Sequence, residues 1–410
     1  MNLNTSKKQR KDIITKNIFF NKNFQKLWTV GAITMANQWL EMLAISIFVY
    51  SATQSALAVT FANFARALPM VFFGFFAGII ADRFSRKKLL IFSFTVLLSS
   101  NLVLSLLAYL QLIEIWHILI GMFLTGTVFA TDFPIRRNML GEMAGSTLIG
   151  KVMGYDSVAR NGTRIIGPLL GGALMEYSGL YGAYLLLALL YSINILQMYI
   201  LKYEKNYTGN KSKESYYILI IEGLKFAKKN PPIFGFLFVT LIMNLFAFPY
   251  MTMVPVIGES TLKVSPLMIG IILSIEGFGA MSGSLFISLF KSPKYYKKFY
   301  YFGSCLFMLG ILFIGISKTY EITLGIALIA GLGVAGFSTM QSTLPFIIAP
   351  PHMRSRILGL VSVCIGINPL GILLVGILAT TFNPATAIMV TASCGLISLL
   401  ILYIFIKEVH

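Results

Sequence analysis

Long stretches of hydrophobic residues alternate with short polar or charged breaks along most of this 410-residue chain. Each stretch has about 20 residues or more, which is what a helix needs to cross the hydrocarbon core of a membrane. The stretches are continuously apolar and lack the alternating pattern of barrel strands. The pattern predicts membrane-spanning helices at residues 27–50, 55–81, 89–110, 116–135, 152–175, 180–202, 232–257, 265–290, 299–317, 321–347, 355–380 and 384–406.

A longer polar break divides these twelve predicted helices six and six. Its second part, residues 216–229, has the spacing of an amphipathic helix on a membrane surface. We therefore expect an all-α membrane protein. Its expected parts are a basic N-terminal segment (1–26), a first six-helix half (27–202), a linker (203–231), a second six-helix half (232–406) and a short tail (407–410).

Composition and charge agree with this fold class. Hydrophobic residues make up 57% of the chain and charged residues 12%, against about 25% charged in soluble domains. If the N-terminus is cytoplasmic, 28 of the 33 Lys and Arg residues fall in cytoplasmic segments, and the expected external loops hold only Lys263 and Lys318. The pattern predicts a monomeric multi-pass protein of the inner (plasma) membrane with both termini cytoplasmic. Its net charge of +18 indicates contact with anionic lipids rather than nucleic acid.

Cysteine and histidine are few. Cys305, Cys364 and Cys394 all lie in predicted spans without close pairing, and the three histidines are scattered, so we expect no metal and no cofactor. The chain has no G-x-x-x-x-G-K-S/T phosphate loop, which argues against an ATP-driven pump. An enzyme would need a nucleophile and base or a metal cluster, and the sequence supplies neither, so we expect no enzyme activity.

Several ionisable residues lie inside predicted spans, where each costs at least about 2.5–3.5 kcal/mol and therefore suggests a function. The helical rise places Glu41, Arg66 and Glu276 at about one depth. We hypothesise that Glu41 and Arg66 form an ion pair and that Glu41 is the principal proton-binding group. The alternative is a structural pair that only orients the helices. Glu276 is a second carboxylate candidate, for a cationic solute or a second proton.

Polar and aromatic residues lie one turn below Glu41. Asn37, Gln38 and Trp39 are predicted to line a substrate cavity, although buried amides also join helices by hydrogen bonds and a tryptophan can simply pack. In the fifth span Asp156, Arg160 and Arg164 follow at four-residue steps along one face.

Such a charged stripe must face protein or water. Asp156 and Arg160 can pair within the helix, which leaves Arg164 as an unpaired cation for the cavity.

Residues 78–88 read Gly-Ile-Ile-Ala-Asp-Arg-Phe-Ser-Arg-Lys-Lys. This segment resembles the loop signature G-x-x-x-D-R-x-x-R-K/R-K/R of the major facilitator superfamily, with Ser85 where the family usually has a second glycine. The resemblance implies two pseudo-symmetric six-helix halves that rock to expose a central site alternately. It also implies a cytoplasmic gate, which we expect to involve the following residues: Gly78, Asp82, Arg83, Arg86 and Asp132.

In this gate, the resemblance places Asp82 against the start of the eleventh span, and we hypothesise that Asp132 forms a relay with Arg86. The alternative is that the cations of this loop only retain it in the cytoplasm.

The fifth span carries a second motif, made of Gly162, Gly167, Pro168, Gly171 and Gly172. It resembles the G-P-x-x-G-G motif associated with exporters and antiporters of the superfamily. Glycines allow close approach of a neighbouring helix, and the proline removes a backbone hydrogen bond.

The first 175 residues further resemble the branch with the enterobactin exporter and macrolide-efflux proteins, through Gln38-Trp39-Leu40 and Ala65-Arg66-Ala67-Leu68-Pro69. Those relatives often carry Asp at the position of Gln38. The resemblance implies a secondary active transporter that exports small amphipathic molecules, such as drugs or siderophores, in exchange for protons. A proton-coupled uptake symporter is the alternative, and a non-transporting receptor or scaffold is a more remote one.

Overall fold

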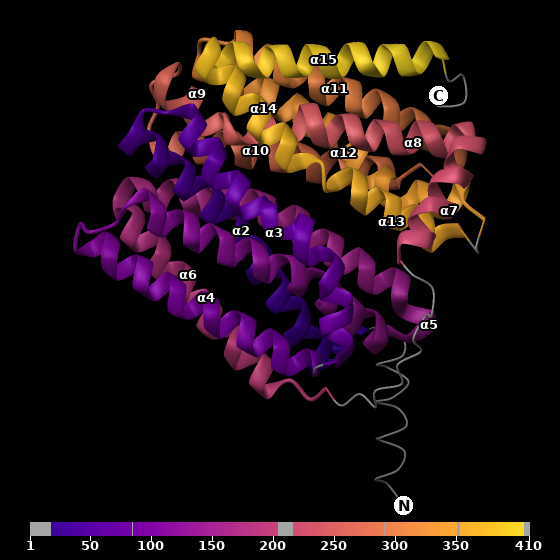
Figure 1. Cartoon of the computed structure of the whole chain (residues 1–410), viewed down its shortest axis with the longest axis horizontal. Helices are drawn as coiled ribbons and strands as arrows, with labels where there is room; N and C mark the ends of the chain where they lie inside the picture. The colour runs from indigo at the N-terminus through magenta and orange to yellow at the C-terminus, as the bar shows by residue number, and fades with distance from the viewer. Residues whose placement is uncertain (1–17, 84, 204–215, 291, 351–352, 406–410) are drawn as a thin grey trace, which may run out of the picture.

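The computed structural model describes residues 18–83, 85–203, 216–290, 292–350 and 353–405, with the backbone alone at residues 20, 71–83, 145–147, 150, 216–220, 293 and 355. This part of the chain is almost entirely helical (Figure 1). Ten helices within it are long and apolar enough to cross a membrane. That finding is compatible with twelve spans, since α3 and the second arm of α5 supply the other two.

The first half consists of a short 3₁₀ helix followed by α-helices. Its elements are η1 (Ile18–Phe20), α2 (Lys22–Thr53), α3 (Ala56–Arg83), α4 (Arg86–Tyr109), α5 (Ile115–Tyr177) and α6 (Gly179–Ile200). The Asn21 side chain caps α2 by accepting a hydrogen bond from the backbone amide of Asn23 at 2.9 Å. Gln54, with φ of 51°, ends α2 in the left-handed conformation.

Helix α5 contains the fourth and fifth predicted spans, and its backbone is helical throughout. The chain nevertheless reverses direction within α5. Two contacts show this reversal: Arg136 lies 3.3 Å from Asp156, and Gly141 lies close to Met153. A helical turn therefore joins two antiparallel arms, where the sequence predicted a loop from residue 136 to residue 151.

The linker contains α7 (Tyr216–Lys229), as predicted. Glu222 of α7 pairs with Arg356 at 2.7 Å, and Gly223 packs on Leu360, so α7 lies against the second half. The elements of that half are α8 (Pro231–Ile242), η2 (Met243–Ala247), η3 (Phe248–Thr252), α9 (Val254–Ser260), α10 (Pro266–Ser288), η4 (Pro293–Tyr295), α11 (Tyr296–Ile316), α12 (Tyr320–Ile348), α13 (Arg354–Ile365), α14 (Asn368–Thr381) and α15 (Pro384–Phe405).

Two spans of the second half are interrupted. The seventh passes from α8 through a π-helical turn, η2, and a 3₁₀ turn, η3, into α9. The eleventh breaks at Gly366 and Ile367 between α13 and α14. Pro249 lies in η3, and Pro369 follows the break at Gly366 and Ile367; a proline cannot donate the backbone hydrogen bond that a continuous helix requires. Both predicted spans are present, over Pro231–Ser260 and Arg356–Thr381, and the hydrophobic pattern gave no indication of their interruptions.

The two halves form two stacked layers, the first indigo to magenta and the second orange to yellow in Figure 1. They meet through the pairs α5–α10 and α3–α14. At the end of the molecule away from α7, Glu176 of α5 accepts hydrogen bonds from the Ser265 hydroxyl at 2.6 Å and the Leu267 amide at 2.9 Å. Thr60 of α3 packs on Gly376 of α14 towards the same end. We name this end the joined end, and the end that carries α7 the linker end.

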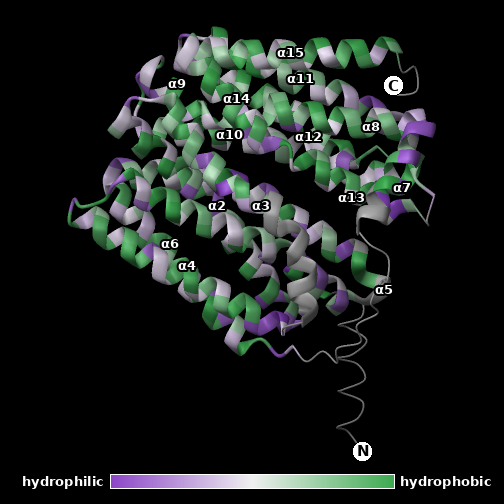
Figure 2. Cartoon of the chain, in the orientation of Figure 1, coloured by the Kyte–Doolittle hydropathy of each residue, from purple (hydrophilic) through white to green (hydrophobic). Residues whose placement is uncertain are grey.

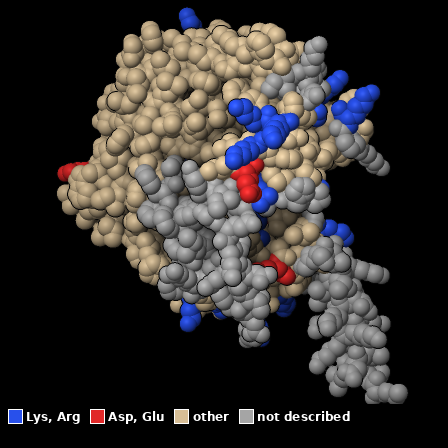
Figure 3. Space-filling view, turned by 45° about the vertical axis from the view of Figure 1, so that its right-hand side comes forward, with Lys and Arg blue, Asp and Glu red and all other residues tan. Residues whose placement is uncertain are grey.

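The outer surface is apolar and the linker end is basic. Phe92 and Leu289 are 67% and 73% exposed, and Figure 2 shows hydrophobic residues along the outer helices α4 and α15. Lys and Arg gather towards the linker end, which is turned forward in Figure 3; Lys225, Lys228 and Lys229 of α7 are among the exposed cations. This surface is what a helical bundle in a bilayer requires.

Candidate functional site

An ion pair joins the two halves in the middle of the spans. The Arg164 guanidinium of α5 pairs with the carboxylate of Glu276 in α10, which is 1% exposed. The Tyr250 hydroxyl of η3 donates to the other carboxylate oxygen of Glu276. Arg164 also lies over the Trp39 ring, 5.4 Å from its centroid. The prediction of an unpaired Arg164 is therefore wrong, because Glu276 from the other half neutralises it.

The glycines of the fifth-span motif set the distances around this pair. A Cβ on Gly167 would clash with Trp39 and lie 2.9 Å from the Ala36 carbonyl, so Gly167 allows α5 to pack closely on α2. Gly171 makes the same kind of contact with Leu40.

Gly172 lies against Gly270 of α10, the neighbouring half, and Gly270 in turn lies against the Pro168 carbonyl. A Cβ on Gly162 would meet no atom of another element within 4 Å. Most of the motif therefore serves helix contact, both within the first half and between the halves.

Glu41 is buried inside the first half, with 3% exposure. Its carboxylate accepts a hydrogen bond from the Thr125 hydroxyl at 2.9 Å. Arg66 interacts with it electrostatically, but no direct ion pair between the two is found in the described part of the chain. The predicted contact pair is thus replaced by two separated charges at one level, with Thr125 as the direct partner of Glu41.

A cavity of about 150 Å³ lies between the halves beside this group, and we name it the central cavity. Its lining residues are Gln38, Trp39, Met42, Asn63 and Arg66 of the first half, with Phe248, Met251, Thr252, Asn368 and Ile372 of the second. A neighbouring cavity of about 230 Å³ shares Phe248 and Asn368 and includes Gly366. Both interrupted spans therefore reach the cavities, as they do in transporters whose broken helices form the solute site.

Some of the residues predicted to line the cavity do so in the structure, and others do not. Gln38 and Trp39 line the central cavity, and so does Arg66, for which no hydrogen bond is found within the described residues. Asn37 does not line it. That side chain is fully buried in the first half, near the Tyr191 hydroxyl, and neither of its amide atoms has the geometry of a hydrogen bond.

A buried charge network connects the two arms of α5 nearer the linker end. Arg136, with a 2% exposed side chain, contacts Asp132 at 3.4 Å and Asp156 at 3.3 Å. Asp156 also pairs with Arg160 at 3.5 Å, as predicted from their spacing. Arg136 lies just after the fourth predicted span, residues 116–135, and was therefore not counted among the charges within spans, although the four-residue step from Asp132 to Arg136 was a usable signal.

The predicted gate is described only in part. The expected relay between Asp132 and Arg86 is not formed in this conformation, in which Asp132 pairs with Arg136 and Arg86 pairs with Glu142 at 2.8 Å. Gly78, Asp82 and Arg83 belong to α3, but their side chains lie outside the described residues. At the start of the eleventh span, Arg354 donates to the Phe346 and Ala349 carbonyls.

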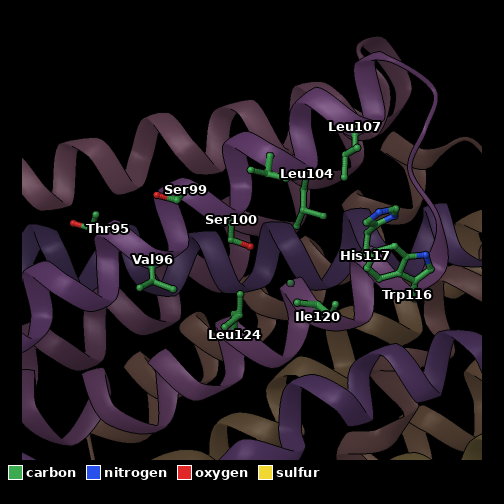
Figure 4. Close-up of a pocket in the computed structure, with 12 residues that line it drawn as sticks. Thr95, Val96, Ser99, Ser100, Leu104, Leu107, Trp116, His117, Ile120 and Leu124 are labelled. Carbon is green, nitrogen blue, oxygen red and sulfur yellow. The ribbon is translucent and has the colours of Figure 1, made fainter.

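A separate groove of about 510 Å³ lies on the flank of the first half, between α4 and the first arm of α5 (Figure 4). Thr95, Ser99 and Ser100 contribute hydroxyls to a lining that is otherwise mostly apolar. Trp116 and Ile120 at its edge are 53% and 52% exposed. The groove thus opens on the lipid-facing surface and is distinct from the central cavity.

Comparison with known proteins matches residues 17–409 to the major facilitator family described as a transmembrane secretion effector. The chain is 24% identical to macrolide efflux protein A of Streptococcus pyogenes over 70% of this chain and 71% of that protein. It is also 24% identical to the staphyloferrin A transporter of Staphylococcus aureus, over 84% of this chain and 86% of that one.

Among solved structures, a POT family transporter in complex with 5-aminolevulinic acid superposes with a TM-score of 0.74 at 12% identity, over 94% of this chain and 96% of that one. The nucleoside transporter NupG gives 0.72 at 12% identity, over 94% and 99%. These similarities support the fold. The chain is a membrane transporter rather than an enzyme, and it belongs to the transmembrane secretion effector family of the major facilitator superfamily.

Proposed function

We propose that the chain exports small amphipathic molecules in exchange for protons by alternating access, with Glu41 as the proton-binding group. The observation that supports this proposal most strongly is the position of Arg66 and Glu41 at the central cavity. Arg66 lines the cavity, and the buried carboxylate of Glu41 lies at the same level and interacts with it electrostatically. The family description and the efflux relative support export.

The orientation follows from the positive-inside rule. The basic linker end faces the cytoplasm, and the joined end faces the outside of the inner membrane. The contacts at Glu176 and between Arg164 and Glu276 then hold the outer side closed, so this conformation receives solute from the cytoplasm.

Opening the outer side requires these contacts to separate as the halves rock. Closing the inner side is assigned to the predicted gate around Gly78, Asp82, Arg83 and Arg86.

The charge at the cavity wall determines whether the proton and the solute favour or oppose each other's binding. With Glu41 ionised, its negative charge offsets that of Arg66, and the cavity accepts a positively charged amphipathic solute. When Glu41 takes up a proton, the charge of Arg66 is left without compensation, and the wall repels the same solute. A proton and a cationic solute therefore disfavour each other's binding, which is the condition for antiport.

The test uses purified protein in liposomes with a panel of dyes, macrolides and siderophores. An imposed proton gradient should drive solute exclusion by the wild type, and Glu41→Gln should lower this rate by about tenfold or more, as expected for loss of a proton-transfer group. Counterflow of solute without a gradient should continue, because it needs no net proton movement. Glu321→Gln at the start of α12 is the matched control and should behave as wild type.

Two results would overturn the proposal. Gradient-driven transport by Glu41→Gln at the normal rate would remove its proton role. Accumulation of solute along an inward proton gradient would indicate an uptake symporter instead.

A further inference from the structure

One face of α2 presents polar groups to the interior of the first half. Glu41, Asn37 and Thr34 follow one another at steps of four and three residues, and Gly31 continues the same face towards the linker end. Asn37 is 0%, Thr34 2% and Glu41 3% exposed. These three side chains do not line the central cavity. The face therefore leads away from Glu41 through protein rather than along the solute site.

Helix α6 supplies the groups opposite this face. Tyr191 lies near Asn37, and its hydroxyl interacts electrostatically with both Glu41 and Asp132. Asn194, three residues on, donates from Nδ2 to the Thr34 hydroxyl at 3.1 Å. Tyr191 thus lies near enough to interact with the carboxylates of both Glu41 and Asp132.

Several buried polar atoms of this region have no hydrogen-bond partner. They are the Tyr184 hydroxyl, Oδ1 of Asn194, Oδ1 of Asp132 and both amide atoms of Asn37; the Tyr191 hydroxyl interacts with the Asn37 amide, but without the geometry of a full hydrogen bond. Tyr184 lies seven residues before Tyr191 on the same face of α6 and interacts electrostatically with Glu41. Buried polar groups are nearly always satisfied by protein or by ordered water, so a series of unpaired atoms indicates water molecules between them.

The series ends in the charge network of α5. The Arg136 guanidinium packs against Gly31 and contacts Asp132 and Asp156. Asp156 reaches Arg160, whose side chain is 37% exposed. A series of buried polar groups therefore leads from Glu41 in mid-span towards Arg160, whose side chain is partly exposed, on the linker-end side.

We propose that this set is a hydrated proton path inside the first half, separate from the central cavity. We name it the polar file and define it by Glu41, Asn37, Tyr191, Asn194, Asp132 and Asp156. The proposal rests on the proposed function, because Glu41 is its proton-binding end. The solute uses the space between the halves, while the proton reaches the cytoplasmic side through the interior of one half.

Proton movement along the file balances at each step. The Glu41 carboxyl gives its proton to a neighbouring water and becomes a carboxylate. Each hydroxyl or water oxygen on the way accepts one proton and releases another. The carboxylate of Asp156 takes up the last proton and releases it to solvent water beside the partly exposed Arg160, which itself stays protonated. The groups that face Glu41 are Arg66 of α3, Thr125 of α5 and the two tyrosines of α6, so its release is favoured by the positive charge of Arg66.

The test compares gradient-driven transport with counterflow in liposomes. Tyr191→Phe removes one hydroxyl, and Asn37→Leu removes the amide at nearly constant volume. Both should lower gradient-driven transport by about tenfold or more and leave counterflow within about twofold of wild type. Tyr300→Phe, a buried tyrosine of the second half that bonds Thr240, is the matched control and should keep both activities.

The outcomes separate this proposal from the proposed function. If Glu41→Gln loses gradient-driven transport while Tyr191→Phe and Asn37→Leu both keep it, the proton uses the cavity and the polar file is refuted. If Glu41→Gln keeps it, the proposed function fails first. A structure of the wild type at a resolution that shows water molecules tests the path without relying on variants that fold. Ordered waters beside Asn37 and Asn194 would support the path, and the absence of water along the polar file would overturn it.

Discussion

The interiors of the two halves differ in chemistry. Among the described residues, the first half buries Glu41, Asp132, Arg136 and Asp156, whereas the second buries Glu276 as its charged residue. That one carboxylate is neutralised by Arg164 of the first half. The difference indicates that charge chemistry is concentrated in the first half, and that the second half contributes mainly shape.

Buried aromatic rings pack against one another in the interior of the second half. Tyr300 lies 5.3 Å from both Phe236 and Phe337, and Tyr250 lies 5.6 Å from Phe307, measured between ring centroids. The two interrupted spans belong to this half as well. An apolar, aromatic interior with broken helices can adjust to a solute without the cost of moving buried charges.

The largest effect on the difference between the halves is expected when Arg136, the central cation of the first half, is replaced. Arg136→Met leaves Asp132 and Asp156 buried without their shared partner and should lower the free energy of unfolding by about 3–5 kcal/mol. Arg160→Met is the matched control, because that side chain is 37% exposed and its loss should cost about 1 kcal/mol or less. Thermal unfolding in detergent measures both. Equal stability of the two variants would show that the buried network is not a special feature of this half.

A smaller effect is expected at the glycines of the fifth-span motif. A methyl group on Gly167 meets Trp39 and the Ala36 carbonyl, so Gly167→Ala should cost about 1–3 kcal/mol. A Cβ on Gly162 would meet no atom of another element within 4 Å, and Gly162→Ala should be neutral or stabilising by about 0.5–1 kcal/mol through helix propensity. Unfolding temperatures of the two variants test this ordering, and a reversed order would contradict the close packing of α5 on α2.

The helical architecture could be predicted from the sequence, but the pairing of the buried charges could not. Apolar stretches of spanning length predicted the helices, and α7 has the predicted bounds, because both follow from local periodicity. Depth along a helix also predicted that Glu41 and Arg66 share one level. Rotation about the helix axis and the approach of the other half decide contacts, however, and these placed Arg164 on Glu276 and turned Asn37 away from the cavity.

The same limit explains the missed elements. Arg136 was read as a loop residue, and its two partners come from both arms of a hairpin whose turn stays helical. Close packing accompanies the break at η2, where Gly371 of α14 lies against the Leu245 carbonyl. Such tertiary contacts leave no periodic signal in one sequence.

The smallest predicted effect lies at the joined end. Hydrogen bonds from Ser265 and from the Leu267 amide lower the pKa of Glu176 from its ordinary value of 4.5. The ionised carboxylate therefore contributes to the closed outer side at all pH values above 4.5, and this contribution is lost as the pH falls through the lowered pKa.

Spin labels on the outer ends of α5 and α10 measure this closure. Between pH 5 and 7 the closed population should not change through Glu176, and below that range wild type should open while Glu176→Gln stays nearly constant. A transition near pH 7 that Glu176→Gln abolishes would contradict this account of the joined end.

The most direct test of the central claim is proton release on solute binding. Purified protein in detergent, held near neutral pH in weak buffer with a pH indicator dye, is titrated with a cationic amphipathic solute that it transports. Wild type should release protons as the solute binds, because the cation favours the ionised form of Glu41, and Glu41→Gln should bind solute without release. Equal proton release by Glu41→Gln and wild type would contradict the assignment of Glu41 as the exchanging group.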